Sequence, residues 1–184
     1  MRIRITILFA IALAGLVIAQ EQPGVPDGLP WPRGVYLRTG SDWIQLPANP
    51  LMPFLNGDAR WLLGFGHSDP VAEMPGPHAL VQLGNGKPMF YLRGLPASNG
   101  IYLVRSEPKE DYRQIRMPRS RDFRQFTRLR QQDMIELDMR AISGDVLSAT
   151  PRTELKPGEY AIVSVFEQNL RQIRASFDFG VSGK

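Results

Sequence analysis

Residues 149–166, ATPRTELKPGEYAIVSVF, constrain the fold more than any other part of the chain. Residues 156–159 have the composition of a tight turn, because Pro157 fixes φ at the first central position and Gly158 tolerates a positive φ at the second. The turn leads into residues 160–166, where β-branched and aromatic residues predict a strand that is buried on both faces. We therefore expect a β-sheet domain with this strand at its centre.

The N-terminus has the features of a secretory signal peptide. Arg2 and Arg4 form a basic start, residues 5–19 are apolar and uncharged, and Ala19 ends a stretch that suits cleavage. The apolar run is shorter than the roughly 20 residues of a membrane-spanning helix. We predict a cleaved signal peptide at 1–19 and export to the periplasm or the exterior of a bacterium; an uncleaved N-terminal anchor is the alternative.

Composition narrows the class of protein. The 184-residue chain has no cysteine, so an exported form has neither a lipid-anchored cysteine nor disulfides and depends on its core for stability. The formal net charge is +4, and Arg2 and Arg4 contribute two of these charges. This balance is too even to require nucleic acid or an anionic membrane as the partner.

The pattern along the chain predicts three regions. After the signal peptide, residues 20–33 are rich in Pro and Gly and predict an extended leader, with Trp31 as the first residue that packs on the domain. Residues 34–184 are long enough for a single β domain with its own core.

Several hairpins are expected within this domain. Residues 34–47 and 100–118 share a Gly-(Val/Ile)-Tyr-Leu start, a polar turn and an aromatic residue before the return strand, which indicates two similar hairpins. A third is predicted for residues 78–83 and 87–92, because the pair Asn85-Gly86 between apolar runs favours a tight turn. Residues 48–77 are expected to be irregular, and a single helical turn or an edge strand at the short apolar patch 61–63 is left open.

The C-terminal half adds one helix and further strands. Residues 119–132 are the only plausible helix. Residues 135–141 alternate between apolar and charged side chains and predict one strand, and residues 173–179 predict the last strand. The expected fold is therefore mainly β, an antiparallel β-sandwich or barrel-like sheet with at most one short helix.

Three motifs support a resemblance to known sequences. The segments GVYLRTGSDWIQLP, TPRTELKPGEYA and the C-terminal FDFGV resemble the strand and turn motifs of a family of uncharacterised secreted bacterial proteins. The resemblance covers about a third of the chain in scattered pieces. It implies a fold and an export route, and it assigns no catalytic residue because the family has no known activity.

No catalytic or metal-binding constellation is evident. His67, Ser68 and Asp69 are adjacent, but side chains that follow one another in sequence usually point apart, so a polar loop is favoured over a catalytic triad. His78 is expected at the surface. Two histidines without cysteine do not form a typical zinc site, and we predict no metal and no cofactor.

Three carboxylates are candidates for a catalytic acid and base. Glu136 and Asp138 lie two residues apart on one strand face, and Glu159 lies beside Tyr160. We expect all three to face solvent in the ordinary way for a strand.

The richest functional feature is the basic segment, which we define as residues 105–130. It holds nine Lys or Arg residues against four acidic ones. Such a segment either forms a solvated sheet face, with arginine stems covering apolar neighbours, or contacts an anionic partner. The predicted contact residues are Tyr112, Arg116, Arg119, Arg121, Phe123, Arg124, Phe126 and Arg128.

The sequence therefore favours an exported, non-catalytic binding or envelope-associated module. Its expected partner is an anionic envelope component or another envelope protein, with no nucleic acid and no membrane span after removal of the signal peptide. Two alternatives remain open: an envelope hydrolase that uses His67 and Asp69 with a distant Ser, and a structural subunit that docks by adding an edge strand.

Overall fold

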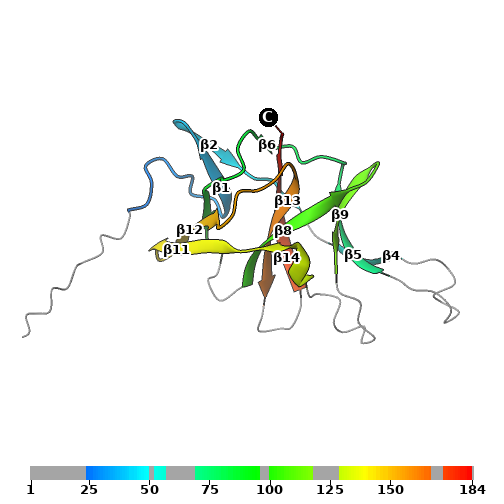
Figure 1. Cartoon of the computed structure of the whole chain (residues 1–184). Coiled ribbons are helices and arrows are strands. Elements are labelled where there is room, and N and C mark those ends of the chain that lie inside the picture. Colours follow the sequence, from blue (N-terminus) through cyan, green and yellow to red (C-terminus); the bar gives the residue numbers. More distant parts are fainter. Residues whose placement is uncertain are drawn as a thin grey trace, which may run out of the picture.

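Strand β13 (Gly158–Phe166) lies in the interior of the larger of two β-sheets (Figure 1). It pairs in antiparallel fashion with β14 (Gln172–Val181) on one side and with β8 (Gly100–Pro108) on the other. Residues 160–164 are all buried. The predicted central strand that is covered on both faces is confirmed for these residues.

The computed structural model describes residues 24–49, 52–56, 69–95, 100–117, 129–166 and 172–183. The larger sheet has the order β3-β14-β13-β8-β9-β5-β4, with β10 beside β8 and β6 beside β14, and the smaller has the order β11-β12-β7-β1-β2. All pairings are antiparallel except that of β6 with β14. The remaining strands are β1 (Gly34–Thr39), β2 (Asp42–Gln45), β3 (Ala48–Asn49), β4 (Met52–Asn56), β5 (Asp69–Pro75), β6 (Gln82–Leu83), β7 (Phe90–Arg93), β9 (Tyr112–Arg116), β10 (Met134–Ile135), β11 (Leu137–Ser143) and β12 (Val146–Pro151).

The two curled sheets form a half-barrel that resembles a sandwich, so the expected mainly-β, antiparallel fold class is confirmed. Within the described ranges, the single helical element is the 3₁₀ turn Gln131–Asp133. Of the helix predicted at residues 119–132, the described residues 129 and 130 are not helical, since the Arg130 backbone is extended, and only 131 and 132 belong to the 3₁₀ turn; residues 118–128 lie outside the described part of the chain.

The main core fills the space between the two sheets. Val35, Leu92 and Phe90 come from the smaller sheet, and Ile162 and Phe179 come from the larger one. The rings of Phe90 and Phe179 lie 5.0 Å apart across the interface. Interdigitation of alternate inward-facing side chains from two sheets is the usual core of a β-sandwich.

A second core occupies the opposite face of β13. Ala161 and Val163 there pack with Val104 of β8, Ile115 of β9 and Met74 of β5. The larger sheet is curled, so that strands at one end of it cover the face that the smaller sheet does not reach. Burial on both faces of β13 follows from these two cores together.

Both of the similar hairpins are present, in different sheets. Strands β1 and β2 form one, and β8 and β9 form the other. A Cβ on Gly34 would lie 3.5 Å from the ring of Tyr36, and one on Gly100 would lie 2.5 Å from the ring of Tyr102. In each hairpin the tyrosine therefore covers the strand glycine two residues before it, which explains the shared Gly-x-Tyr spacing.

The predicted hairpin at residues 78–92 is wrong. Strand β6 pairs in parallel with β14, while β7 pairs with β1 and β12 of the other sheet. The Asn85 side chain does accept a hydrogen bond from the Lys87 amide at 3.1 Å, so a turn exists. After this turn the chain crosses from the larger sheet to the smaller one. Pairing of β7 with distant strands there buries Phe90 and Leu92 completely.

Two further expectations are corrected. Residues 48–77 were expected to be irregular apart from one helical turn or edge strand, yet their described part supplies three strands, β3, β4 and β5. The apolar patch 61–63 lies outside the described residues. The single strand expected at residues 135–141 is divided at Glu136: β10 joins the larger sheet through β8, and β11 joins the smaller sheet through β12. Apolar and charged side chains alternate in the same way along one long strand and along two consecutive strands. The alternation at residues 135–141 therefore did not reveal that the chain changes from one sheet to the other.

The segment before β1 packs differently from the expectation. Trp31 is 84% exposed, whereas Leu29 is 6% exposed and lies in a small cluster with Tyr36 and Val146. Arg93 donates hydrogen bonds from Nη1 to the carbonyl oxygens of Leu29 and Pro30, at 3.1 and 2.7 Å. The backbone of this segment is thus held by Arg93. The guanidinium carbon of Arg93 also lies 4.8 Å from the centroid of the Trp31 ring, so Trp31 contacts the domain there but is not buried in it.

Truncation of the central strand should cost much of the stability of the domain. We expect Ile162→Ala to lower the free energy of unfolding by about 2–5 kcal/mol, since Ile162 is fully buried and its loss leaves a cavity. Urea denaturation followed by fluorescence measures this. Leu80→Ala is the control, because Leu80 is 90% exposed and should change stability by no more than about 0.5 kcal/mol. Equal losses in the two variants would contradict a central position of β13.

Candidate anion-binding pocket

The candidate site lies where β8 exchanges one neighbouring strand for another. One edge of β8 pairs with β13 over residues 100–106. The other edge pairs with β10 at Leu103 and Val104 and with β9 at Glu107 and Pro108. The residues between these two pairings, 105 and 106, lie at a notch in the sheet.

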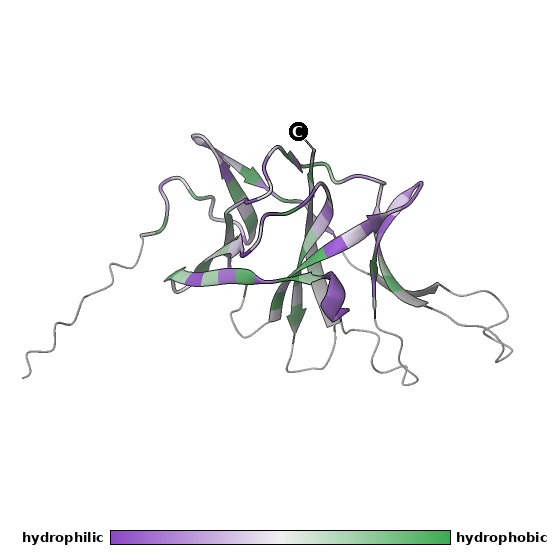
Figure 2. Cartoon of the chain, in the orientation of Figure 1, coloured by the Kyte–Doolittle hydropathy of each residue, from purple (hydrophilic) through white to green (hydrophobic). Residues whose placement is uncertain are grey.

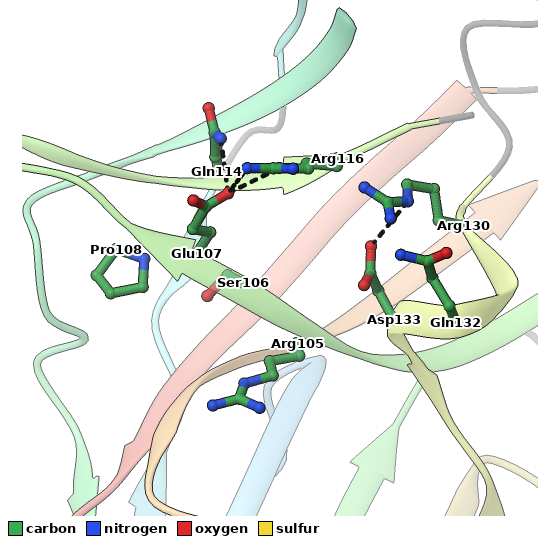
Figure 3. Close-up of a pocket in the computed structure, with 9 residues that line it drawn as sticks. All are labelled: Arg105, Ser106, Glu107, Pro108, Gln114, Arg116, Arg130, Gln132 and Asp133. Carbon is green, nitrogen blue, oxygen red and sulfur yellow. Dashed lines mark hydrogen bonds and ion pairs between the residues drawn. The ribbon is translucent and has the colours of Figure 1, made fainter. Parts of the chain in front are cut away.

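A pocket of about 350 Å³ occupies this notch. Three arginines line it from three different parts of the chain: Arg105 on β8, Arg116 on β9 and Arg130 just before the 3₁₀ turn (Figure 3). Both the 3₁₀ turn and the tip of the β8–β9 hairpin consist mainly of hydrophilic residues (Figure 2). We call this cavity the arginine-lined pocket.

Glu107 compensates one of these arginines. Its Oε2 lies 2.6 Å from Arg116 Nη2 and accepts hydrogen bonds from Arg116 Nε at 2.7 Å and from Gln114 Nε2 at 3.0 Å. Its Oε1 accepts a hydrogen bond from Lys109 Nζ at 2.7 Å. These contacts, with Lys109 and Gln114 first, lower the pKa of Glu107 from 4.5 to about 2.

The other two arginines differ in their partners. Arg130 Nε lies 3.3 Å from Asp133 Oδ2, so its charge is also compensated. Among the described residues, Arg105 has no carboxylate partner; its one side-chain hydrogen bond is a long contact of 3.5 Å from Nη2 to the carbonyl oxygen of Pro157. The lining therefore carries one positive charge that no neighbouring carboxylate neutralises.

The structure places part of the predicted contact surface. Arg116 lines the pocket, whereas Tyr112 is on the same strand but does not line it. Arg105 and Arg130 belong to the basic segment and complete the pocket, although they were not among the predicted contacts. The other predicted contacts lie outside the described residues: Arg119, Arg121, Phe123, Arg124, Phe126 and Arg128.

Another member of the basic segment, Arg113, is not at the surface at all. It is 2% exposed and lies in a buried ionic cluster with Glu159 and Asp178. It donates from Nη2 to Pro75 O at 2.7 Å, from Nε to Gly76 O at 3.0 Å, and from Nη1 to the Asp178 carboxylate. The guanidinium thereby ties β9, the end of β5 and β14 together.

The expectation that Glu159 faces solvent is wrong. Glu159 is 5% exposed, and its Oε2 accepts a hydrogen bond from the Ala79 amide at 2.9 Å. Its Oε1 lies 3.0 Å from His78 Nδ1 and accepts a hydrogen bond from Gln82 Nε2 at 3.3 Å. Both carboxylate oxygens are engaged in anchoring the segment between β5 and β6, which indicates a structural role. In contrast, Glu136 and Asp138 are exposed and pair with Arg152, as expected for an outward strand face.

The histidines offer no catalytic arrangement in the described part of the chain. The His78 side chain is 74% exposed, which confirms the prediction of a surface histidine. His67 lies outside the described residues, and Asp69 is the first residue of β5. No group of three or more potential metal-binding side chains occurs in the described ranges.

Comparison of the chain with protein-family models, curated proteins and solved structures finds no match. The resemblance to secreted bacterial proteins therefore stays a prediction. Within the ranges that the structure describes, no helix is long and apolar enough to cross a membrane.

The ion pairs of Glu107 predict a pH-dependent contribution to stability. A carboxyl group whose pKa is lowered on folding stabilises the fold above its ordinary pKa, and the stabilisation is lost as the pH falls through the lowered value. We expect Glu107→Gln to be less stable than the wild type at pH 7, with a difference that shrinks between pH 4.5 and pH 2. Urea unfolding across this range measures the difference. Glu110→Gln, in the exposed turn of the same hairpin, should have a smaller effect, and a pH-independent loss in Glu107→Gln would contradict the argument.

Loss of the buried guanidinium should be far more severe than loss of a surface arginine. We expect Arg113→Met to lower the free energy of unfolding by about 3–5 kcal/mol, because two buried carboxylates lose their cationic partner. The exposed residue Arg140 provides the control variant Arg140→Met, which should leave the urea midpoint almost unchanged.

Two further variants keep this prediction testable if Arg113→Met does not fold. Arg113→Lys retains the charge but loses the guanidinium fork, so its stability should be intermediate. Addition of Asp178→Asn to Arg113→Met should restore part of the loss. A wild-type midpoint in Arg113→Met would refute the structural role.

Proposed function

We propose that this chain is an exported, non-catalytic binding module whose arginine-lined pocket takes an anionic component of the bacterial envelope. The observation that carries this proposal is the uncompensated charge of Arg105 in a pocket that holds two further arginines. Arginine suits this task because its fork of N–H donors matches a carboxylate or a phosphate.

Binding is favoured over acid–base catalysis by the state of the carboxylates. Glu107 and Asp133 line the pocket, and each is held by an arginine. A carboxylate with a pKa of about 2, such as Glu107, is a poor proton carrier near neutral pH. Export rests on the basic and apolar N-terminal residues.

The edge strand β11 does not favour assembly by strand addition. Within the described sheets, β11 is at one edge of the smaller sheet. Its exposed residues include Asp138 and Arg140, and charged side chains on an edge strand hinder pairing with another chain.

Removal of the pocket arginines should release the protein from envelope material. We expect the full-length variant Arg105→Gln/Arg116→Gln/Arg130→Gln to cosediment with bacterial envelope fractions at least about tenfold less than the wild type, since one charge-assisted hydrogen bond contributes about 1.5–3 kcal/mol. The measurement is the bound fraction after centrifugation over a range of protein concentrations.

The matched control removes three exposed arginines elsewhere, Arg38→Gln/Arg140→Gln/Arg152→Gln, and so lowers the net charge equally. This variant should still bind. Equal losses in the two triple variants would show attraction by net charge alone, and wild-type sedimentation of the pocket variant would refute the proposal. Thermal unfolding of each variant establishes that it is folded.

A further inference from the structure

Four hydrogen-bond donors from three side chains converge on the carboxylate of Glu107. Its Oε2 lies 2.7 Å from Arg116 Nε, 2.6 Å from Arg116 Nη2 and 3.0 Å from Gln114 Nε2 (Figure 3). Its Oε1 lies 2.7 Å from Lys109 Nζ. We call Lys109, Gln114 and Arg116 the carboxylate cradle, because together they engage both oxygens of one carboxylate.

The cradle is chemically matched to this group. Arginine presents its N–H donors as a planar fork, and lysine adds a second positive charge. Gln114 is 5% exposed, so packing fixes the position of its amide. An ionised carboxylate only accepts hydrogen bonds, and Gln114 therefore presents its Nε2 donor to the cradle. Three donor side chains with two positive charges thus surround one acceptor group.

A neighbouring glutamate shows that this arrangement belongs to one position. In the larger sheet, Gln114 lies opposite Glu107 of β8 on one side and opposite Glu73 of β5 on the other. Residues directly opposite each other in a ladder point to the same face, so both glutamates flank Gln114 on one face of the sheet. The Glu73 side chain forms no ion pair or hydrogen bond within the described structure. The donors therefore gather at the position of Glu107 and not around every carboxylate on this face.

The cradle is open to solvent. The exposed fractions of the side chains are 34% for Lys109, 44% for Arg116 and 38% for Glu107. Glu107, Gln114 and Arg116 also line the arginine-lined pocket. A carboxylate on another molecule therefore has access to the same donors once the Glu107 side chain rotates into solvent.

We propose that the carboxylate cradle binds a carboxylate of the envelope component and that Glu107 is its internal competitor. The entering carboxylate takes the place of Glu107 between Lys109 and Arg116. The same donors are bonded before and after the exchange, so no donor of the cradle is left without a partner. This inference rests on the proposed function, and it specifies both the chemical group of the ligand and the contact that limits its binding.

An internal competitor lowers the apparent affinity of a site. A group on the same chain acts at a high effective concentration, of about a millimolar or more. If Glu107 leaves the cradle free for about a tenth of the time, the apparent affinity is about tenfold below that of the open cradle. Removal of the Glu107 carboxylate should therefore strengthen binding, although it removes an ion pair from the fold.

The first test is rescue of a truncated variant by acetate. The purified full-length variant Glu107→Ala is unfolded with urea at pH 7 in sodium acetate, sodium chloride or sodium phosphate of equal ionic strength. We expect acetate at about 100 mM to shift its unfolding equilibrium about tenfold toward the folded state relative to chloride, which corresponds to a dissociation constant of about 10 mM. The wild type and Glu73→Ala, which removes a carboxylate from the same face, should show no such shift. Addition of Arg116→Gln to Glu107→Ala should abolish it.

The second test is cosedimentation with envelope fractions. Glu107→Ala should bind about tenfold more tightly than the wild type. Glu107→Gln, which preserves the volume of the side chain, should also bind more tightly and provides the same test if Glu107→Ala does not fold. Glu73→Ala changes the net charge equally and should bind as the wild type does, which separates release of the cradle from a general gain of positive charge.

Each contrary outcome overturns the inference. An equal effect of acetate on Glu107→Ala and Glu73→Ala would show a general salt effect, and an equal effect of phosphate and acetate would replace the carboxylate with anions in general. Sedimentation of the folded Glu107 variants no stronger than that of Glu73→Ala would exclude competition by Glu107. If sedimentation depends on the pocket arginines while these results fail, the proposed function stands; if it does not depend on them, the proposed function fails even when acetate binds.

Discussion

The whole architecture depends on the need to cover both faces of β13. Its alternate side chains point in opposite directions, and those of Tyr160 and Ile162 enter one core while those of Ala161 and Val163 enter another. A flat sheet opposed by a single second sheet would cover only one of these faces. The smaller sheet covers the first, and the curl of β8, β9 and β5 covers the second. In this cysteine-free chain the two cores take the place of covalent cross-links.

The curl of the larger sheet brings the residues of the buried ionic cluster together. Arg113 lies where β9 approaches β14, and it pairs there with Asp178 and contacts the carbonyl oxygens at the end of β5. Buried charges lose their hydration, and only a fully bonded arrangement compensates this loss. Glu159 anchors the segment after β5 by the same means, through Ala79 and His78. The cluster therefore specifies how the curled end of the sheet closes on β13.

The pocket is a consequence of the same curl. One edge of β8 pairs with β10 at two residues and with β9 at two others, and the residues of β8 between these pairs lie at the notch. Arginines from β8, β9 and the segment before the 3₁₀ turn meet there because the β8–β9 hairpin and the segment that leads into β10 adjoin the same short stretch of β8. The residues of the candidate site are thus carried by the irregular part of the sheet, while its regular part supplies the rigid support.

Local sequence patterns were sufficient to predict strands and hairpins whose formation depends on residues adjacent in the chain. The β-branched run before Phe166 identified the central strand, and the hairpins that begin at Gly34 and Gly100 were found from their turns. The sequence did not reveal which strands that are distant in the chain pair with one another. The pair Asn85-Gly86 has the composition of a hairpin turn, yet its flanking segments join different sheets because each gains more burial from a distant strand. Glu159 stands in a strand like any outward carboxylate, and only the packing of Arg113 and Ala79 around it buries it.

The same division holds for the site. The basic composition of residues 105–130 was evident from the sequence, and Arg116 within it lines the pocket. Only the tertiary structure shows that Arg113 is buried and structural, whereas Arg105 lines the pocket. Sequence alone determined the strand-forming character of the chain and where its charges accumulate, because both follow from side-chain chemistry and local spacing. Strand pairing and the burial of Arg113 depend on contacts between residues far apart in sequence, and those exist only in the folded chain.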